Sequence, residues 1–369
     1  MADEAPQRGW DPMSFVPGNA VEIDADWLGA ALADRHPGAR VEAVEIVDRA
    51  EVTNSHAWLR VGYADAAGAA ESLFCKLLPN DPQRRIAIAQ TNMGLREARF
   101  YESLAPQLAI RVPRAYVVRY DEGDGAFVLL LEDLSASGCT MSSGPESPSR
   151  DAAAQALEDL AAMHVRFEDP AVRREQAGWV TELDPPSDYA ILRLEEGLGR
   201  HRDKLTDAFA EMAALYIEKQ AAIHAVWSGG GPRTVIHGDT HVGNLFDDHG
   251  RTGFLDWGLV VVSTPLRDVS YFLNMSLSVE DRRAYDRELI RHYLEVRRAL
   301  GGISIDFDEA WRAHRIQASY LAPASCQTVT FPEDVTERRK RFAAAFLERA
   351  SAAIEDLESR AALREFAGL

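Results

Sequence analysis

The chain has 369 residues, of which 46% are hydrophobic and 27% charged, and its formal net charge is −18. A chain of this length can bury a sizeable core and is typical of about two domains. The strongly acidic balance argues against a nucleic acid or an anionic membrane as a partner. In addition, no uninterrupted apolar run approaches the roughly 18 residues of a membrane span.

The first 20 residues contain three prolines and few apolar anchors, which is typical of a flexible arm. The start of this arm, MADEAPQRGW, lacks the apolar stretch of a signal peptide. The three cysteines, Cys75, Cys139 and Cys326, lie far apart and have no C-x-x-C spacing. This usage argues against a disulfide framework or a zinc knuckle, so we expect a cytoplasmic protein.

An N-terminal lobe is expected over residues 21–133. A short helix should begin at Asp24 and end at Pro37–Gly38. Helical spacing also runs from Arg85 to Leu104, and a polar, serine- and glycine-rich connection over residues 135–149 marks the boundary of the lobe. Apolar runs predict five strands, over residues 41–49, 56–64, 72–79, 115–120 and 126–132.

Residues 134–369 are expected to form a larger and mostly helical lobe. One helix is predicted over residues 151–167 and a long one over most of residues 333–360. Another should begin with a capping pattern, Ser278 to Asp281, and end at Gly301–Gly302. The chain therefore consists of a small lobe with five strands and one main helix, a linker, and a helical lobe.

Within the helical lobe, the stretch VIHGDTHVGNLF (235–246) brings several polar side chains together on a loop between two short apolar segments. After it, a turn near residues 249–250 would pair two strands, with Asn244 opposite residue 255 or 256. Asn244 and Asp256 would then offer two oxygen ligands, which suit a magnesium ion that keeps several waters and binds substrate phosphates. Asp239, which precedes the hairpin, could orient a hydroxyl group and accept its proton.

A second pair of charged residues is predicted in the small lobe. Lys76 lies on the otherwise apolar third strand, where burial is costly unless the charge is paired. Glu97 lies on the helix that follows, on the face shared with Met93 and Tyr101. A strand lysine and a helix glutamate in consecutive elements match the ion pair that holds nucleotide phosphates in protein kinases.

HGDTHVGN followed by FLDW resembles the H-G-D-x-x-x-x-N and [IL]-D-[WF] motifs of the aminoglycoside-phosphotransferase and choline-kinase-like family. REARFY (96–101) and LLLEDL (129–134) also resemble that family, especially its ecdysteroid-kinase-like branch. The resemblance extends from about residue 40 to about residue 300. It implies an α+β, two-lobed protein-kinase-like fold with a small five-stranded antiparallel N-lobe, and a phosphotransferase that uses ATP and Mg²⁺, with the nucleotide between the lobes.

The resemblance also implies roles for individual residues. Asp239 becomes the catalytic base, Asn244 and Asp256 become the metal ligands, and Asp268 becomes a structural residue. The loop AEVTNSH (50–56) departs from the family, which often carries glycine there. The residues expected to hold ATP are Lys76 and Glu97 at the phosphates, Thr53, Asn54 and Ser55 in that loop, and Glu132, Asp133 and Leu134 as the backbone hinge for adenine.

Other interpretations remain open at this stage. Asp239 and Asn244 could each stabilise a turn, and His237 could brace the loop rather than transfer a proton. A metallophosphoesterase would also contain G-D and D-x-H elements, but no G-N-H-[DE] segment is present. A non-catalytic pseudokinase would be expected to lack the lysine, the base or the metal ligands. A protein kinase is disfavoured because HGD replaces H-R-D and no A-P-E segment follows.

The acceptor is expected to be a small molecule with a hydroxyl group, bound by the helical lobe of a monomer or homodimer, roughly at residues 180–225 and 265–330. In residues 182–211, acidic residues such as Asp184 alternate with basic ones, whereas a polycationic aminoglycoside demands a dense carboxylate lining. A largely apolar acceptor, such as a sterol, a polyketide or a hydroxyacyl thioester, is therefore preferred over an aminoglycoside or another antibiotic. The basic run ERRKRF (337–342) reads as a solvated helix face. The aromatic residues expected near the acceptor are Trp179, Tyr189, Trp257, Tyr271, Phe272 and Trp311.

Overall fold

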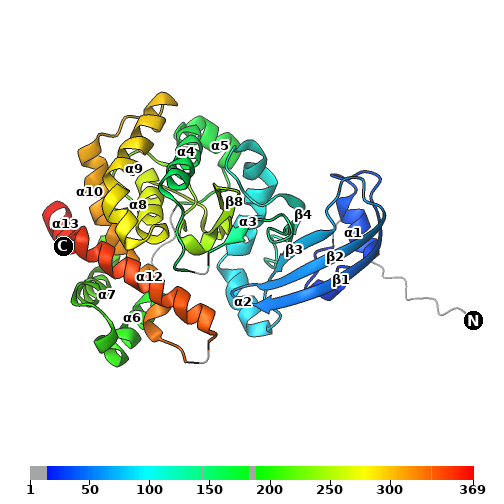
Figure 1. Ribbon diagram of the computed structural model, residues 1–369, viewed down its shortest axis with the longest axis horizontal. Coiled ribbons are helices and arrows are strands. Elements are labelled where there is room, and N and C mark those ends of the chain that lie inside the picture. The colour runs from blue at the N-terminus through cyan, green and yellow to red at the C-terminus, as the bar shows by residue number, and fades with distance from the viewer. Residues whose placement is uncertain (1–14, 143, 183–187, 334) are drawn as a thin grey trace, which may run out of the picture. The chain divides into compact units, whose positions relative to one another are not determined.

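A computed structural model describes residues 15–142, 144–182, 188–333 and 335–369 of the chain (Figure 1). The chain forms two compact units. The N-terminal unit contains residues 1–106 and 113–139, and the C-terminal unit contains residues 107–112 and 140–369. Residues 1–14 of the expected arm and Asp184 of the expected acceptor region lie outside the described residues.

The N-terminal unit is built on a five-stranded sheet with the order β1-β2-β3-β5-β4. All its neighbouring strands are antiparallel, as predicted. Helix α1 (Ala25–Leu32) begins at Asp24, whose side chain accepts a hydrogen bond from the Trp27 N–H, and it buries Trp27 in the core of this unit together with residues of the sheet. Phe15 and Val16 pack against the same core. The strands are β1 (Arg40–Glu51), β2 (Ser55–Asp65), β3 (Ser72–Leu77), β4 (Ala115–Tyr120) and β5 (Phe127–Glu132).

The single helix predicted from Arg85 to Leu104 is wrong. The chain instead forms α2 (Pro82–Gln90) and α3 (Met93–Arg99), and α3 continues as a π-helix over Phe100–Leu104. The break lies at Asn92, whose φ of 56° is left-handed and ends the first helix. Asparagine tolerates this conformation better than most residues do, and helical periodicity alone does not reveal such a break.

The C-terminal unit contains most of the helices, which agrees with the predicted helical lobe (Figure 1). The helix expected to follow Ser278 is α9, and the Asp281 N–H donates to Ser278 Oγ at its first turn. The helix expected over residues 333–360 begins later, at Glu337. The helices are α4 (Arg150–Arg166), α5 (Pro170–Ala177), α6 (Asp188–Arg200), α7 (Asp207–Trp227), α8 (Pro265–Ser276), α9 (Val279–Ala299), α10 (Phe307–Gln317), α11 (Leu321–Ala324), α12 (Glu337–Asp356) and α13 (Ser359–Ala367).

Two small sheets frame the candidate catalytic loop. One pairs β7 (Thr234–Ile236) with β10 (Val261–Ser263), and the other has the order β6-β8-β9. The strands of the second sheet are β6 (Thr140–Met141), β8 (Leu245–Asp248) and β9 (Arg251–Phe254). Because the loop leaves β7 and enters β8, both of its ends are fixed by backbone pairing.

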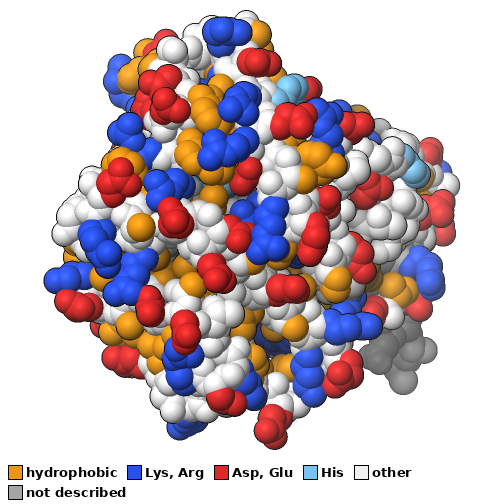
Figure 2. All heavy atoms as spheres, turned by 60° about the vertical axis from the view of Figure 1, so that its left-hand side comes forward, with side chains coloured by type: hydrophobic (Ala, Val, Ile, Leu, Met, Phe, Trp, Pro, Cys, Tyr) orange, Lys and Arg blue, Asp and Glu red, His pale blue; other side chains and the backbone are white. Residues whose placement is uncertain are grey.

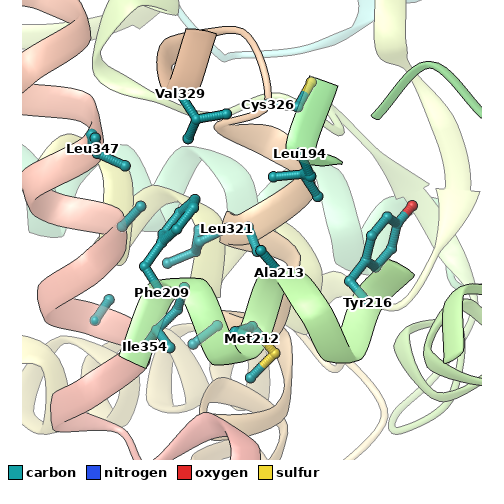
Figure 3. Close-up of a cluster of buried hydrophobic side chains, with 14 of the residues drawn as sticks. Leu194, Phe209, Met212, Ala213, Tyr216, Leu321, Cys326, Val329, Leu347 and Ile354 are labelled. Atoms are coloured by element: carbon teal, nitrogen blue, oxygen red, sulfur yellow. The ribbon is translucent and has the colours of Figure 1, made fainter. Parts of the chain in front are cut away.

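A large hydrophobic cluster fixes the helices of the C-terminal unit to one another (Figure 3). Phe209 and Met212 of α7 face Leu321 of α11, and Leu347 of α12 closes the cluster from another side. On the face drawn in Figure 2, acidic and basic side chains are interspersed rather than segregated. Within the described ranges, no helix is both long enough and apolar enough to span a bilayer.

His314, which lies on α10, should make the stability of the fold sensitive to acid. Its side chain is buried, Nδ1 lies 3.0 Å from Ser270 Oγ, and burial, reinforced by Arg282 and Arg287, lowers its pKa to about 3. The pKa of an unfolded histidine is about 6.5, so the stability contributed by the neutral ring is complete above that pH and is lost as the pH falls towards 3.

Between pH 7 and pH 5, we therefore expect the free energy of unfolding of the wild type to fall by about 2 kcal/mol more than that of His314→Asn. Urea titrations followed by circular dichroism at both pH values would measure the difference. An equal pH dependence in the two proteins would contradict the burial of a neutral His314.

Candidate functional site

The hairpin that carries the predicted metal ligands has the register expected from the sequence. Its turn residues, His249 and Gly250, both have positive φ, 53° and 92°, which is typical of a two-residue type I′ turn. Leu245 pairs with Phe254, and the Leu255 N–H donates to the Asn244 carbonyl at 3.0 Å. Asn244 therefore lies opposite Leu255, one of the two positions predicted, and Asp256 is the next residue along the chain.

The backbone at Asp256 redirects the chain as it leaves the hairpin. Its φ and ψ are 61° and 68°, in the left-handed region that a residue with a side chain rarely adopts. Such a conformation costs on the order of 1–3 kcal/mol and is found mainly at functional sites. The backbone at Asp256 is therefore strained, at the point where the chain leaves the hairpin.

The side chains of Asp239 and Asn244 are joined directly. The Asn244 amide nitrogen donates to Asp239 Oδ2 at 2.8 Å and to the Asp239 carbonyl at 2.9 Å. Asn244 therefore holds Asp239 in place. The sequence had suggested that Asp239 precedes the hairpin and has no contact with it. Because the amide nitrogen is used in this way, the amide oxygen of Asn244 faces away from Asp239 and can act as a ligand.

This donor set fits a magnesium ion. The oxygens of Asn244 and Asp256 are hard ligands, and magnesium is usually bound by one or two protein groups while waters and phosphates complete its shell. In the part of the chain that the structure describes, no group of three or more histidines, cysteines or carboxylates could hold a metal ion by itself. The site thus differs from the multi-histidine centre that a dinuclear metallophosphoesterase requires.

The buried carboxylate of Asp268, on α8, holds the backbone of the catalytic loop. Asp268 Oδ2 accepts from the His237 N–H at 2.7 Å and Oδ1 accepts from the Gly238 N–H at 2.8 Å. Its carbonyl accepts from Thr240 Oγ1 at 2.9 Å, and His164 Nε2 lies 3.2 Å from Oδ2. Burial alone would raise the pKa of Asp268, but the hydrogen bonds and the two histidines outweigh it and hold that pKa below its usual value.

His237 is fully buried and braces the loop. Nε2 lies 3.1 Å from the Leu255 carbonyl, to which it can only donate, and Nδ1 accepts from the Asp239 N–H at 3.2 Å. These two bonds define a neutral tautomer, and burial lowers the pKa of the ring. Next to it, Gly238 has a φ of 84°, and a Cβ at this position would collide with the Leu259 carbonyl. The loop therefore requires glycine at position 238.

The direction of His241, which the sequence left open, is clear in the structure. Nδ1 accepts from the Gly243 N–H at 3.0 Å, so the proton of a neutral ring lies on Nε2, which is 3.6 Å from Asp239 Oδ2. The other edge of the ring contacts Phe346 on α12, with ring centroids 5.2 Å apart. His241 thus lies between the predicted base and a helix far away in the sequence.

In the N-terminal unit, Lys76 and Glu97 form a buried ion pair. Lys76 Nζ lies 2.6 Å from Glu97 Oε2, and the two side chains are only 6% and 3% exposed. Lys76 pairs with Leu129 and His56 across the sheet, so the strand sets its position. Glu102, the next carboxylate along the chain after Glu97, accepts a hydrogen bond from the Tyr120 hydroxyl at 2.7 Å.

The three residues of the predicted phosphate loop differ in their surroundings. They form the turn between β1 and β2, in which the Val52 N–H donates to the Asn54 carbonyl at 3.0 Å. Thr53 is exposed, whereas Asn54 is buried and its Oδ1 has no hydrogen-bond partner among the described residues. Ser55 Oγ accepts from the Asn80 amide at 3.1 Å, so the turn already uses this hydroxyl.

The predicted hinge residues follow directly from β5. Glu132 ends the strand, and its Oε2 accepts from the Arg114 N–H at 3.1 Å. Asp133 caps the following turn, because it accepts from Ser72 Oγ at 2.5 Å and from the Ser135 N–H at 3.1 Å. The carbonyls of Asp133 and Leu134 also accept from backbone N–H groups within that turn. The side chains of Glu132 and Asp133 and the carbonyls of Asp133 and Leu134 therefore already have hydrogen-bond partners, in the turn or in neighbouring segments.

Three of the aromatic residues expected near the acceptor belong to the core. Trp257, Tyr271 and Phe272 are at most 4% exposed, so they cannot form the wall of an open acceptor site. Tyr189 is exposed, whereas Trp311 packs against Phe307 and His314. Bulky residues in helical segments are more often core than binding surface, and these positions follow that rule.

Comparison with known proteins decides the family. The sequence matches the phosphotransferase enzyme family, APH, over residues 72–303. The chain belongs to this family. It is therefore a phosphotransferase that acts on a hydroxyl group of a small molecule. A comparison with curated proteins gives no significant match.

One solved structure supports the kinase-like fold of this phosphotransferase, and a second is reported for comparison. The GDP complex of aminoglycoside 2'-phosphotransferase-IIIa has a TM-score of 0.50 at 13% identity, over 90% of this chain and 99% of that one. A choline/ethanolamine kinase family protein from Mesorhizobium loti is 18% identical, with a TM-score of 0.46 over 92% and 99% of the two chains. At such identities the first of these supports the kinase-like fold alone.

Asp268→Asn should destabilise the phosphotransferase strongly. Both carboxylate oxygens accept from backbone N–H groups, and an amide offers only one acceptor oxygen, so one buried N–H would face an NH₂ group. We expect a loss of about 3 kcal/mol in the free energy of unfolding. The matched control is Asp308→Asn, an exposed aspartate of α10, which should change stability by less than about 0.5 kcal/mol. Equal urea midpoints for the two variants would contradict the role of Asp268.

Proposed function

We propose that this phosphotransferase transfers the γ-phosphoryl group of ATP, with Mg²⁺, to the hydroxyl group of a largely apolar small molecule. The hydrogen bond between Asp239 and Asn244, at the start of the hairpin that ends at Asp256, is the main support. It links a carboxylate that can accept a proton to an amide whose oxygen can bind a metal ion. The two functions are thus adjacent but carried by different residues.

In this proposal Asp239 is the catalytic base. Its carboxylate, held by Asn244, aligns the acceptor hydroxyl and accepts the proton as the oxygen attacks. The loop that carries it is fixed by the buried side chains of Asp268 and His237, so the carboxylate needs little reorganisation in the transition state. Positioning of this kind supplies much of the acceleration in phosphoryl transfer.

Asn244 and Asp256 would hold the metal ion. When bound, magnesium neutralises the charge that develops on the phosphate oxygens. The strained backbone of Asp256 and the hydrogen-bonded amide of Asn244 both fix the directions of the ligands before any ion arrives. Little conformational freedom would then be lost when the ion binds.

Lys76 would neutralise the nucleotide phosphates, with Glu97 keeping its ammonium group in place. Of the predicted phosphate loop, Thr53 offers an exposed hydroxyl and Asn54 a buried oxygen that lacks a partner in the described chain. Asn54 cannot donate from that oxygen, so backbone N–H groups and Thr53 would contact the phosphates. Among the hinge residues Glu132 to Leu134, backbone groups outside the turn's own hydrogen bonds would bind adenine.

We further propose that residues 21–133 form the nucleotide-binding lobe and residues 134–369 the lobe that carries the catalytic loop and the acceptor site. The enzyme would act in the cytoplasm, as a monomer or homodimer. An aminoglycoside or another antibiotic is the alternative acceptor, since one structure of similar fold is an aminoglycoside phosphotransferase.

Substitution of the two carboxylates should separate their roles. Asp239→Asn keeps an oxygen that can accept from Asn244 but cannot take a proton, so we expect turnover to fall about a thousandfold with little change in Mg-ATP affinity. Asp256→Ala removes a charged ligand and should weaken nucleotide binding at least about tenfold, only when magnesium is present. Calorimetric titrations with ATP, with and without magnesium, together with a phosphorylation assay, would measure both effects.

Asp247→Asn provides the control in the same hairpin, because Asp247 is exposed and its side chain accepts from the Gly250 N–H of the turn at 3.0 Å. This variant should behave as the wild type in both measurements. An equal loss of nucleotide affinity in Asp239→Asn and Asp256→Ala would refute the division of roles.

Lys76 and Glu97 should act as a coupled pair. Lys76→Met and Glu97→Gln should each raise the KM for ATP, and the double variant should cost less than the sum of the two by about 1 kcal/mol or more. Steady-state kinetics of the four proteins form the cycle. Unfolding titrations are needed alongside, because removal of one partner from a buried pair also destabilises the fold. Strictly additive losses would show that the ion pair does not act on the nucleotide as one unit.

A further inference from the structure

A cavity of about 510 Å³ in the C-terminal unit borders the catalytic loop at His241. Its other walls come from the segment after α11 and from the first half of α12. A volume of this size is typical of sites for small molecules. The sequence predicted an acceptor site over roughly residues 180–225 and 265–330. The second of these ranges includes Ala324, Gln327 and Thr328, which line the cavity, whereas the start of α12 was read as a solvated face.

His241 connects the cavity to the predicted base. Its ring lines the cavity, and its Nε2 lies 3.6 Å from Asp239 Oδ2. The end of the cavity at His241 therefore lies next to a side chain that is close to the Asp239 carboxylate. Gly243 allows this arrangement, because a Cβ there would lie 2.8 Å from both His241 Cε1 and Phe342 Cζ.

The walls next to His241 are aromatic. Phe342 and Phe346 stack with centroids 5.8 Å apart, and both line the cavity with Phe331. Phe331 has a φ of 43°, which is an outlier for a bulky residue and marks a strained position. Lys204 Nζ lies 4.7 Å from the centroid of the Phe331 ring. These rings favour an apolar body in the ligand.

Among the described residues that line the cavity, one basic side chain has no acidic partner. Arg339 is exposed and makes no ion pair within the described ranges, and Lys340 pairs with Glu337 at 3.0 Å. Glu333 is the acidic residue among the lining side chains. The basic run at the start of α12, which read as a solvated face, thus gives the cavity a rim with one uncompensated cation, Arg339, in a chain of net charge −18. Such a rim repels a polycation and attracts an anion.

We propose that this cavity is the acceptor site, and that the acceptor is an apolar alcohol that also carries a carboxylate or a phosphate group. The inference rests on the proposed function of Asp239. The apolar body would pack on Phe342 and Phe346, the anionic group would meet Arg339, and the hydroxyl would lie beside His241. The hydroxyl oxygen then forms a bond to the γ-phosphorus as the bond to the bridging oxygen of the nucleotide breaks, and the hydroxyl proton passes to Asp239.

Four probes with one chain and one hydroxyl test the charge of the acceptor. They are 12-hydroxydodecanoate, its methyl ester, 12-aminododecan-1-ol and dodecane-1,12-diol monophosphate, used below their micelle concentrations. We expect Asp239→Asn to bind the carboxylate or the phosphate at least about tenfold more tightly than the ester, and the amine most weakly, by calorimetry. The carboxylate and phosphate arms distinguish the two sources of negative charge. Equal affinity for all four, a preference for the amine, or no binding of any probe would overturn the proposal.

Arg339→Gln and Arg338→Gln locate the binding site. Both arginines are exposed residues of the same helix, but only Arg339 lines the cavity. We expect Arg339→Gln to weaken binding of the anionic probe about tenfold without changing binding of the ester, and Arg338→Gln to change neither. Phe342→Ala should weaken binding of both probes. Equal effects of the two arginine variants would show that bulk charge, and not this cavity, attracts the probe.

The outcome also separates this proposal from the function on which it rests. If the wild type phosphorylates the ester or the amine in preference to the anionic probes, the assignment of Asp239 stands and the acceptor class is wrong. If the wild type binds an anionic probe in the cavity but Asp239→Asn transfers phosphate as fast as the wild type, the acceptor site stands and the catalytic assignment fails.

Discussion

The buried carboxylate of Asp268 is the constraint on which the rest of the site depends. An ionised aspartate with almost no solvent contact is costly unless several donors compensate for its lost hydration. Here two consecutive N–H groups of the catalytic loop and His164 provide that compensation. The loop therefore cannot move away from α8 without exposing an uncompensated charge. Because the loop is bonded to α8 in this way, the packing of the helical core also fixes the position of Asp239.

The side chains of the loop also fix the orientation of one another. The amide of Asn244 donates to Asp239 and so orients its own oxygen in the opposite direction. One planar group thus fixes both the proposed base and a proposed metal ligand, and a rotation that improved one would spoil the other. The left-handed backbone at Asp256 adds a similar restriction on the far side of the hairpin. Preorganisation of this kind lowers the reorganisation required in the transition state.

Much of this arrangement could be predicted because its determinants are local. Apolar runs give the five strands, and a two-residue turn sets the register of the hairpin. A lysine in an apolar strand demands a partner, and the next helix offers Glu97. Tertiary features could not be predicted in the same way. Periodicity shows which face of α12 is apolar but does not show that Phe346 contacts His241, and it treats the buried ring of Phe272 and the cavity-lining ring of Phe342 alike.

The charge of the chain illustrates the same limit. A net charge of −18 describes the field at a distance, which is screened over about 8 Å at physiological ionic strength. Within a cavity, the nearest side chains dominate, and among the described lining residues Arg339 is a cation without an ion-pair partner, whereas Lys340 is paired with Glu337. An acidic protein can therefore present a basic rim to its substrate, and an aspartate base is compatible with an anionic acceptor as long as the two charges lie at opposite ends of the molecule. An apolar body between the hydroxyl and the anionic group would provide that separation, which is why the aromatic walls and the basic rim belong to one inference.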